Sequence, residues 1–110
     1  MKVDKKGHTT ILKETKGDII AFIDNVSNQY TLHKDQNLIV DVSHDKKVTL
    51  TDIMNFKELV KKHKKAKKSF VIVADDIEFS EVPDYLTVVP SLLEAHDIIE
   101  MEEIERDLGF

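Results

Sequence analysis

The sequence predicts an α/β fold built on a mostly parallel four-stranded sheet with about three helices. Two apolar segments carry this prediction, residues 37–42 and 69–74, and neither alternates apolar with polar side chains. Such runs are typical of strands that are covered on both faces. The lysine-rich amphipathic segment between them has the length of a helix. Two strands joined by a helix form a βαβ unit, whose crossover is almost always right-handed, so we expect parallel strands with the helix over one face.

The length and composition of the chain limit its class. The 110 residues are enough for one modest core, so we expect a single domain spanning residues 1–110. Cysteine is absent, which excludes a disulfide, a thiolate nucleophile and a cysteine-ligated metal, and fits a cytoplasmic location. The longest apolar runs are only a few residues long. We therefore expect no signal peptide, no transmembrane span and no membrane partner.

The N-terminal third is expected to supply one strand and one helix. Residues 1–8 form a polar, flexible lead-in, and residues 9–14 form a short strand whose polar neighbours favour the edge of the sheet. Asp18 follows a break in this strand and has the position of a helix N-cap. The helix after it buries apolar residues that recur every three or four positions, namely Ile19, Phe22 or Ile23, Val26 and Tyr30.

A second helix is expected between the two apolar strands. The polar residues 43–47 form a loop, and Thr49 and Asp52 then have the spacing of a capping box in which Asp replaces the usual Glu. The lysines occupy the outer faces of this helix. Its buried positions are expected to be Ile53, Phe56, Leu59, Val60 and His63 or Ala66.

The C-terminal part is expected to form a short strand and a third helix. An acidic connector at residues 75–84 leads to a strand at residues 86–90, which its proline ends. Ser91 and Glu94 have the spacing of a capping box at the start of the last helix, and Gly109 ends it. The buried stripe of this helix is expected to contain Ala95, Ile98 or Ile99, Met101, Ile104 and Leu108.

The order of these elements resembles the STAS domain, which is shared by sulfate-transporter tails and bacterial anti-sigma-factor antagonists. The matching features are the strand that ends Val40-Asp41-Val42-Ser43, the helix that begins near residues 49–52, the apolar strand 70–74 and the run Leu92-Leu93-Glu94-Ala95. The resemblance covers about residues 9–108. It implies a non-enzymatic regulatory module that docks a protein partner through the loop and helix at residues 43–56.

The resemblance also marks two threonines. In STAS antagonists, a partner kinase phosphorylates a hydroxyl residue in an Asp-Ser-Ser/Thr-Gly stretch at the start of this helix. The equivalent place here reads Thr49-Leu50-Thr51-Asp52, without the glycine or a serine pair. Thr49 and Thr51 are phosphoacceptor candidates through this resemblance, whereas helix capping accounts for at least one of them without any function.

A second resemblance carries a functional label that the residues do not support. Residues 97–110 and 69–73 are similar to short bacterial proteins that are often labelled ribonuclease Z. That enzyme is a metallo-β-lactamase-fold hydrolase with a dense His-x-His-x-Asp-His cluster. The histidines of this chain are scattered singly, without a pair at ligand spacing. They are His8, His33, His44, His63 and His96.

The strongest place for a site is the loop after the first apolar strand. His44 and Asp45 follow the carboxyl end of a central parallel strand, where open α/β sheets bind ligands. A lone His-Asp pair without a nucleophile or a glycine-rich turn is more simply a solvated loop. The three glycines are isolated, so no phosphate-binding loop is present. We therefore expect no enzymatic activity, no metal and no cofactor.

Asp41 lies inside an apolar strand and needs partners or solvent. We favour a carboxylate that emerges at the end of the sheet. It then accepts hydrogen bonds from backbone N–H groups of residues 49–51, or alternatively positions the loop 43–47. The full set of candidate interaction or phosphoacceptor residues is Asp41, Ser43, His44, Thr49, Thr51 and Asp52.

The lysine cluster is the strongest charge signal of a chain whose formal net charge is −5. It contains Lys61, Lys62, Lys64, Lys65, Lys67 and Lys68. Such a cluster attracts nucleic acid, and the alternative function is a nucleic-acid-associated accessory protein. However, no arginine or aromatic residue is interleaved, and lysines at a helix end oppose the helix dipole, so a solvated helix end is the default interpretation.

A third interpretation pairs the lysine cluster with acidic residues of the last helix. Residues 92–110 carry seven acidic side chains and one base, Arg106. The two charged segments could meet within one molecule or between two copies of the chain, as in a homodimer. The acidic face is expected to contain Glu94, Asp97, Glu100, Glu103 and Asp107.

Overall fold

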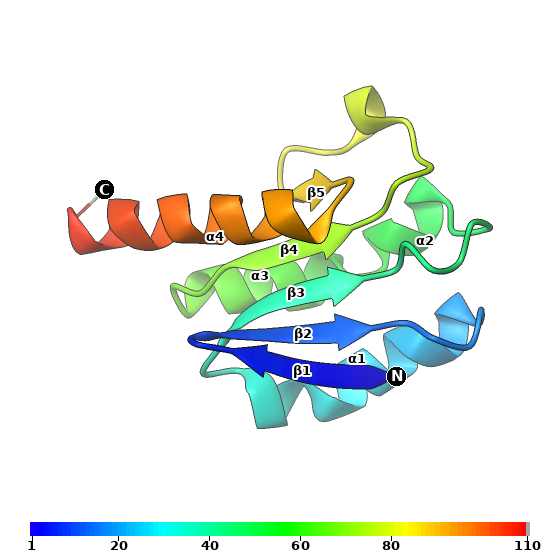
Figure 1. Cartoon of the computed structure of the whole chain (residues 1–110), viewed down its shortest axis with the longest axis horizontal. Coiled ribbons are helices and arrows are strands. Elements are labelled where there is room, and N and C mark those ends of the chain that lie inside the picture. Colours follow the sequence, from blue (N-terminus) through cyan, green and yellow to red (C-terminus); the bar gives the residue numbers. More distant parts are fainter. Residues whose placement is uncertain (110) are drawn as a thin grey trace.

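The sheet of this protein has five strands in the order β1-β2-β3-β4-β5 (Figure 1). The computed structural model describes residues 1–109. Strand β1 pairs antiparallel with β2, and all the other neighbours are parallel. The α/β class is therefore confirmed, but the sheet is mixed and has one strand more than expected. The strands are β1 Lys2–Lys6, β2 Thr9–Lys13, β3 Asn37–Asp41, β4 Phe70–Val73 and β5 Val88–Val89.

The extra strand lies in the segment that the sequence places in a flexible lead-in. Residues 1–8 instead contain β1, which becomes the edge of the sheet, so the prediction that the strand at residues 9–14 lies at the edge is wrong. All five residues of β1 are exposed, and for that reason no hydrophobic pattern announces the strand. Gly7 has a φ of +61°, which permits the tight turn into β2. A charged strand at an edge also discourages pairing with other chains.

Four α-helices connect or follow these strands in the described part of the chain, where about three were expected. They are α1 Ile19–His33, α2 Leu50–Met54, α3 Lys57–Lys65 and α4 Leu92–Asp107, and a single 3₁₀ turn spans Phe79–Glu81.

The helix expected after residue 49 is divided at Asn55 and Phe56. The Asn55 side-chain amide donates to the backbone carbonyls of Thr51 and Asp52, at 3.3 and 3.2 Å. The Asn55 and Phe56 backbone N–H groups donate to carbonyls three residues earlier rather than four. A side chain that competes for backbone carbonyls, together with a tightened turn, ends α2 and lets α3 start in a new direction.

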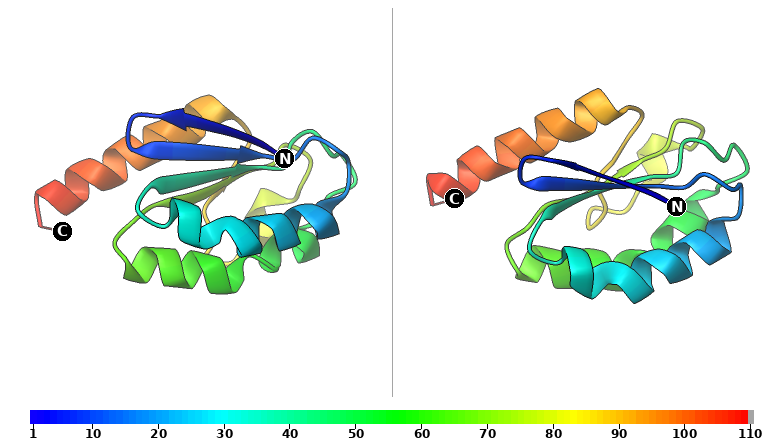
Figure 2. Two further views of the ribbon diagram at one scale, coloured as in Figure 1. Left: turned by 90° about the horizontal axis from the view of Figure 1, so that it is seen from below. Right: turned by 60° about the horizontal axis from the view of Figure 1, so that its bottom comes forward.

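The molecule has three layers, with the sheet in the middle. Figure 2 shows α1, α2 and α3 on one face and α4 on the other. The crossovers from β2 to β3 and from β3 to β4 advance in the same direction across the sheet, so right-handed connections put their helices on the same face. Successive side chains of β3 alternate between two cores, with Leu38 and Val40 facing α1 and α3 and Ile39 facing α4.

Most predicted core positions of the first three helices are confirmed. The buried residues of α1 include Phe22, Val26 and Tyr30, and those of the divided second helix are Ile53, Phe56, Val60 and His63. Of the two alternatives at its end, His63 is buried and Ala66 is exposed.

The predicted stripe of the last helix is largely wrong. Only Ala95 and Ile99 of α4 are buried. Met101, Ile104 and Leu108 have exposed fractions of 60%, 53% and 67%. The physical reason is that these three side chains lie on the side of α4 opposite to Ala95 and Ile99, which face the sheet.

Candidate functional site

The carboxyl ends of the parallel strands meet at one edge of the sheet, and the loop at residues 42–49 leaves from the middle of this edge (Figure 1). The loop connects β3 to α2. This is the place where open α/β sheets bind ligands. The site residues expected from the sequence, from Asp41 to Asp52, therefore do lie in one region of the molecule.

Asp41 anchors the start of the loop. Its side chain is buried, with 2% exposed, so the expectation that it emerges at the end of the sheet is wrong. Its Oδ1 accepts hydrogen bonds from the Ser43 backbone N–H, at 3.0 Å, and from the Ser43 hydroxyl, at 2.6 Å. The favoured partners, the backbone N–H groups of residues 49–51, are therefore also wrong. The carboxylate instead fixes the first turn of the loop, as the alternative interpretation states.

The end of the loop is fixed by the predicted capping box. The Thr49 hydroxyl accepts from the Asp52 backbone N–H at 3.2 Å, and the Asp52 carboxylate accepts from the Thr49 backbone N–H at 3.0 Å. Both halves of the box are present, and the prediction is confirmed. Thr51 is exposed, and its hydroxyl is not part of the box.

The middle of the loop is tied to the next strand. Lys46 Nζ lies 2.6 Å from Asp75 Oδ2, immediately beyond β4. Asp45 accepts a hydrogen bond from the Lys47 backbone N–H at 2.9 Å, and His44 is exposed to solvent. Asp45 therefore shapes the turn of the loop. His44 and Asp45 both lie in this loop, and Asp45 binds the loop backbone.

Glu14 is a buried residue of the same edge that sequence reasoning did not single out. Its Oε2 accepts from the backbone N–H groups of Lys16 and Asp18, at 2.7 and 3.2 Å. Its own backbone N–H donates to the Asp41 carbonyl at 2.9 Å. Two neighbouring strands thus end in buried carboxylates that accept local backbone N–H groups. The sequence feature that could have indicated this role is the position of Glu14, an acidic residue just before the break at residues 16–18.

A second buried polar group lies under the lysine-rich helix. The Tyr30 hydroxyl lies 2.8 Å from His63 Nδ1, and His63 Nε2 lies 2.7 Å from the Gln36 carbonyl oxygen. A carbonyl only accepts, so Nε2 carries the proton and Nδ1 accepts from the tyrosine. Burial lowers the pKa of His63, and the nearby Lys68 and Arg106 charges lower it further, against a raising hydrogen bond to Gln36. The imidazole is therefore neutral and joins α1 to α3.

Part of the lysine cluster is held by contacts within the molecule. Lys62 Nζ lies over the Tyr30 ring at 5.4 Å, and Lys64 Nζ donates to the Tyr85 carbonyl at 2.9 Å. Lys61, Lys65 and Lys67 are exposed. These contacts support the default interpretation of a solvated helix end, in which the lysine stems cover apolar surface and the charges remain in water.

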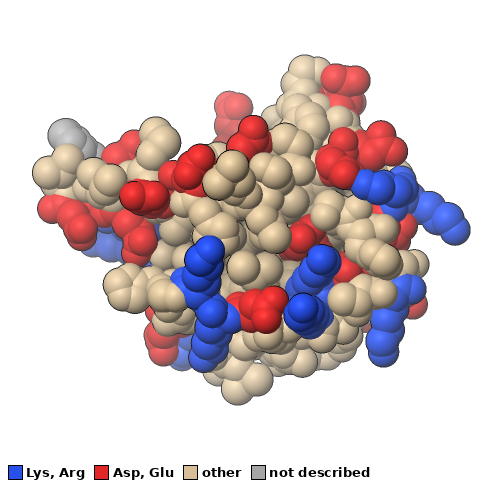
Figure 3. Space-filling view, viewed as in Figure 1, with Lys and Arg blue, Asp and Glu red and all other residues tan. Residues whose placement is uncertain are grey.

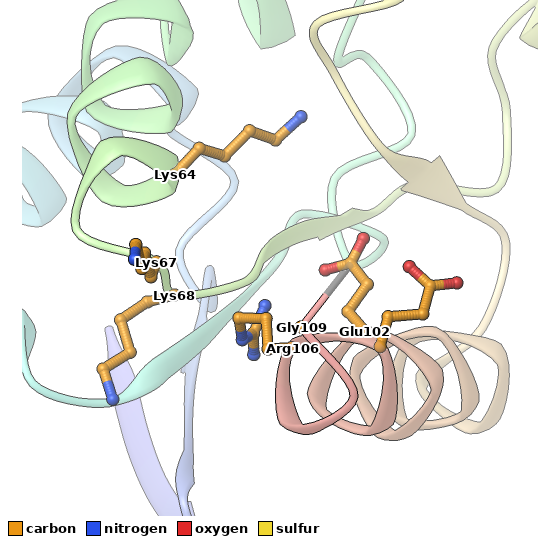
Figure 4. Close-up of a pocket in the computed structure, with 7 residues that line it drawn as sticks. Lys64, Lys67, Lys68, Glu102, Arg106 and Gly109 are labelled. Atoms are coloured by element: carbon orange, nitrogen blue, oxygen red, sulfur yellow. The ribbon is translucent and has the colours of Figure 1, made fainter.

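The lysine cluster also borders α4, as the intramolecular form of the third interpretation requires, although the acidic residues differ from those expected. A hollow of about 450 Å³ is lined by Lys64, Lys67 and Lys68 on one side and by Glu102, Glu105 and Arg106 on the other. Figure 4 shows Lys67 and Lys68 at the end of α3, with Glu102 and Arg106 across the hollow on α4. Of the expected acidic face, Glu103 lies 3.5 Å from His8, at the turn between β1 and β2.

The outer side of α4 is acidic. Figure 3 shows acidic side chains along this helix, with surface that is neither acidic nor basic between them. Within the described residues only two ion pairs are formed, His8 with Glu103 and Lys46 with Asp75. Neither joins the lysine cluster to α4.

Among residues 1–109, no three histidine, aspartate or glutamate side chains are grouped so that they could hold a metal ion. None of the helices in the described chain combines the length and the apolar character that a bilayer crossing requires. Comparison with models of known protein families and with curated proteins finds no match to this chain.

Proposed function

We propose that this chain is a non-enzymatic regulatory module of the STAS-like class, which docks a protein partner through residues 43–56. We call this segment, which consists of the loop after β3 and helix α2, the docking segment. The proposal draws on the order of elements, in which an apolar parallel strand leads through a polar loop into a short capped helix. The family assignment is part of the proposal.

The observation that carries the proposal is the bracing of an exposed loop. Asp41 holds its start, the Lys46–Asp75 pair holds its middle, and the Thr49–Asp52 box holds its end. Bracing lowers the conformational entropy that a partner must remove on binding, so a preorganised loop is a better docking surface than a mobile one.

The surface between these anchors is open to a partner. The side chains of His44, Lys47, Thr51 and Met54 are exposed, whereas Val48 and Ile53 are buried beneath them. The buried pair fixes the segment to the core. A partner would then meet one apolar side chain, Met54, among polar and charged groups, as in the rim and centre of a small interface.

If a kinase regulates this surface, Thr51 is the better acceptor. Its hydroxyl is exposed and outside the capping box, whereas the Thr49 hydroxyl accepts the Asp52 backbone N–H. Phosphorylation of Thr49 would disrupt the hydrogen bond between its hydroxyl and the Asp52 backbone N–H, and so would destabilise α2. Phosphorylation of Thr51 would add negative charge to the docking segment and leave the cap in place.

The test is affinity capture with a matched pair of surface variants. Met54→Arg changes the docking segment, and Leu32→Arg changes an exposed apolar residue of α1. We expect a protein that is captured by the wild type and by Leu32→Arg, survives nuclease treatment, and is lost with Met54→Arg. Purified partner and both variants would then be compared by calorimetry, where Met54→Arg should weaken binding by at least about tenfold.

Recovery of nucleic acid in place of a protein would contradict the proposed docking of a protein partner. The lysine variant Lys61→Gln/Lys65→Gln/Lys67→Gln removes three exposed charges. Capture of nucleic acid that falls steeply with salt and disappears in this variant would favour the nucleic-acid accessory function. Equal capture by the wild type and Met54→Arg would remove the docking segment as the contact surface.

A further inference from the structure

Helix α4 has a second apolar face that no part of the described chain covers. Ala95 and Ile99 pack against the sheet, but Leu93, Met101, Ile104 and Leu108 have exposed fractions of 73%, 60%, 53% and 67%. These four are among the most exposed large apolar side chains of the molecule. Single exposed apolar residues are ordinary on protein surfaces, whereas four on one helix need an explanation.

The four side chains form one stripe. Their separations of eight, three and four residues place them within an arc of about 80° around the helix, for 3.6 residues per turn. Ala95 and Ile99 lie on the opposite side of the same wheel. An apolar stripe with this spacing is the pattern by which a helix packs against another helix.

Acidic residues border the stripe on both sides. By the same helical geometry, Glu94 and Glu105 lie along one side, Glu100 and Asp107 lie along the other, and Asp97 interrupts the stripe. Arg106 is the only lysine or arginine of α4, and it points inward and donates to Ser69 Oγ at 3.1 Å and to Asn37 Oδ1 at 3.3 Å. The outward surface of α4 therefore combines exposed apolar side chains with acidic ones, and the acidic ones are visible in Figure 3.

The negative charge of this surface determines which kind of partner it can bind. Two copies of α4 packed stripe to stripe would bring the same acidic borders together, and like charges held side by side disfavour that pairing. Nucleic acid and anionic lipid are repelled for the same reason. A helix with an apolar stripe bordered by lysine or arginine complements both the apolar and the charged features.

We infer that the outer face of α4 is a second docking surface, which binds a basic amphipathic helix of a partner protein. The surface is formed by Leu93, Met101, Ile104 and Leu108 with their acidic borders. It lies on the face of the sheet opposite to α2 (Figure 2), so it goes beyond the docking segment and does not depend on it. Arg106 keeps the projecting half of the helix attached to the amino ends of β3 and β4.

The test uses a labelled synthetic peptide and fluorescence anisotropy with the full chain. The peptide is a helix of about 18 residues, with leucine at the stripe positions and lysine along both borders. A scrambled peptide of the same composition keeps the charge and loses the stripe. We expect saturable binding of the first peptide, weakening with salt, and at least about tenfold weaker binding of the scrambled one.

Two matched variants locate the binding. Ile104→Glu interrupts the stripe, and Leu32→Glu adds the same charge at an exposed leucine of α1, on the other face of the sheet. We expect Ile104→Glu to weaken binding at least about tenfold and Leu32→Glu to change it by less than about twofold. Because Ile104 is exposed, the variant should fold, and circular dichroism checks this. Met54→Arg should bind the peptide normally, which separates this inference from the proposed function.

Three outcomes would overturn the inference. Equal binding of the ordered and scrambled peptides would mean that only charge is recognised. Equal weakening by both glutamate variants would mean that the stripe is not the site. Sedimentation that reveals a dimer of the chain, dissolved by Ile104→Glu, would show that a second copy covers the stripe despite its charge.

Discussion

Two buried carboxylates, Asp41 and Glu14, end adjacent strands of the sheet and bind backbone N–H groups a few residues further on. Asp41 binds Ser43, and Glu14 binds Lys16 and Asp18. A buried charge is tolerated only when hydrogen bonds replace its hydration. The local turn after each strand supplies such bonds to one oxygen of each carboxylate, Asp41 Oδ1 and Glu14 Oε2, whereas the buried Glu14 Oε1 has no partner among the described residues. This residue-scale device gives both loops at the carboxyl edge a defined starting geometry.

His63 is the buried histidine with the most complete set of partners. Tyr30 donates to one ring nitrogen, and the other donates to Gln36. Protonation would place a second N–H where the tyrosine hydroxyl now donates, and would bury a charge. Burial accordingly lowers the pKa of His63 below 6.5. His33 is also buried, and burial together with the Lys5 charge lowers its pKa in the same direction.

These lowered pKa values predict acid destabilisation. Between the folded pKa and 6.5, the unfolded chain binds more protons than the folded chain, so the free energy of unfolding rises with pH. The stabilisation is complete above pH 6.5 and is lost as the pH falls through the folded values. Each histidine contributes at most about 1.4 kcal/mol per pH unit. Urea denaturation at about pH 7.5 and about pH 5.5 measures the loss.

The matched variant for this prediction is Tyr30→Phe/His63→Leu, which removes the pair together. It should show a smaller loss of stability between the two pH values, whatever its stability at neutral pH. All groups other than this pair are the same in both proteins, so their contributions cancel in the comparison. An identical loss in the variant would mean that His63 does not bind fewer protons in the folded state.

The contacts that start a helix are local, and all three predicted N-cap residues are confirmed, although the capping box predicted at Ser91 and Glu94 forms only its Ser91 half. Asp18 accepts from the Ala21 backbone N–H, Thr49 from Asp52, and Ser91 from Glu94. Each cap uses a side-chain oxygen only a few atoms from the N–H group it binds. Sequence spacing alone therefore fixes the partner.

The cap of α2 gives a prediction at the scale of an element. Thr49→Ala should lower the free energy of unfolding by about 0.5–2 kcal/mol, because the Asp52 backbone N–H loses its acceptor. Thr51→Ala, two residues away and outside the capping box, should change it by less than about 0.5 kcal/mol. Urea denaturation compares the two. Equal effects would mean that the box contributes nothing specific to α2.

At the scale of the whole molecule, Arg106 is the link between the projecting half of α4 and the sheet. Its guanidinium binds Ser69 and Asn37, and Asn37 in turn accepts from the Ser69 backbone N–H at 3.0 Å. These residues come from α4 and from the amino ends of β3 and β4. One side chain thus holds together three segments that are far apart in the sequence.

Removal of this link should loosen α4 unevenly. Arg106→Met keeps most of the apolar stem and removes the donors, so we expect a cost of about 1–3 kcal/mol and faster amide hydrogen exchange after Glu100. The first turns of α4, where Ala95 is buried, should exchange as in the wild type. Glu105→Gln is the control on the same helix. Uniform acceleration along α4, or none, would contradict the role of Arg106.

Much of the fold could be predicted because its signals are local or periodic. The two central strands each contain an uninterrupted apolar run, residues 38–40 in β3 and 70–73 in β4, and the stripes of α1 and α3 recur at helical spacing. Strand β1 could not be predicted in this way. Its residues are all exposed, and it is ordered by backbone pairing with β2, which leaves no pattern in the side chains.

The position of the loop after β3 was predicted from the sequence, whereas the contacts of Asp41 within it were not. The loop after β3 lies at the carboxyl edge, as its place after a parallel strand requires. The hydrogen-bond donors predicted for Asp41 were wrong because the N–H groups of residues 43 and 49–51 are all close to it in the sequence. The turn at Ser43 decides between them. The contacts of Glu14, and the contact between Tyr30 and His63, could not be predicted from sequence spacing.

By itself, the sequence determined the α/β class, the parallel central strands, the helix caps and the core stripes of α1 and α3, because each depends on residues close together in the chain. Only the tertiary structure decided which apolar face of α4 is buried. The helix carries one on each side, and both satisfy a helical period. The sheet covers Ala95 and Ile99, and the other face points away from the sheet. The spacing of apolar residues predicts that a helix has an apolar face, whereas the arrangement of the other elements decides which face is buried.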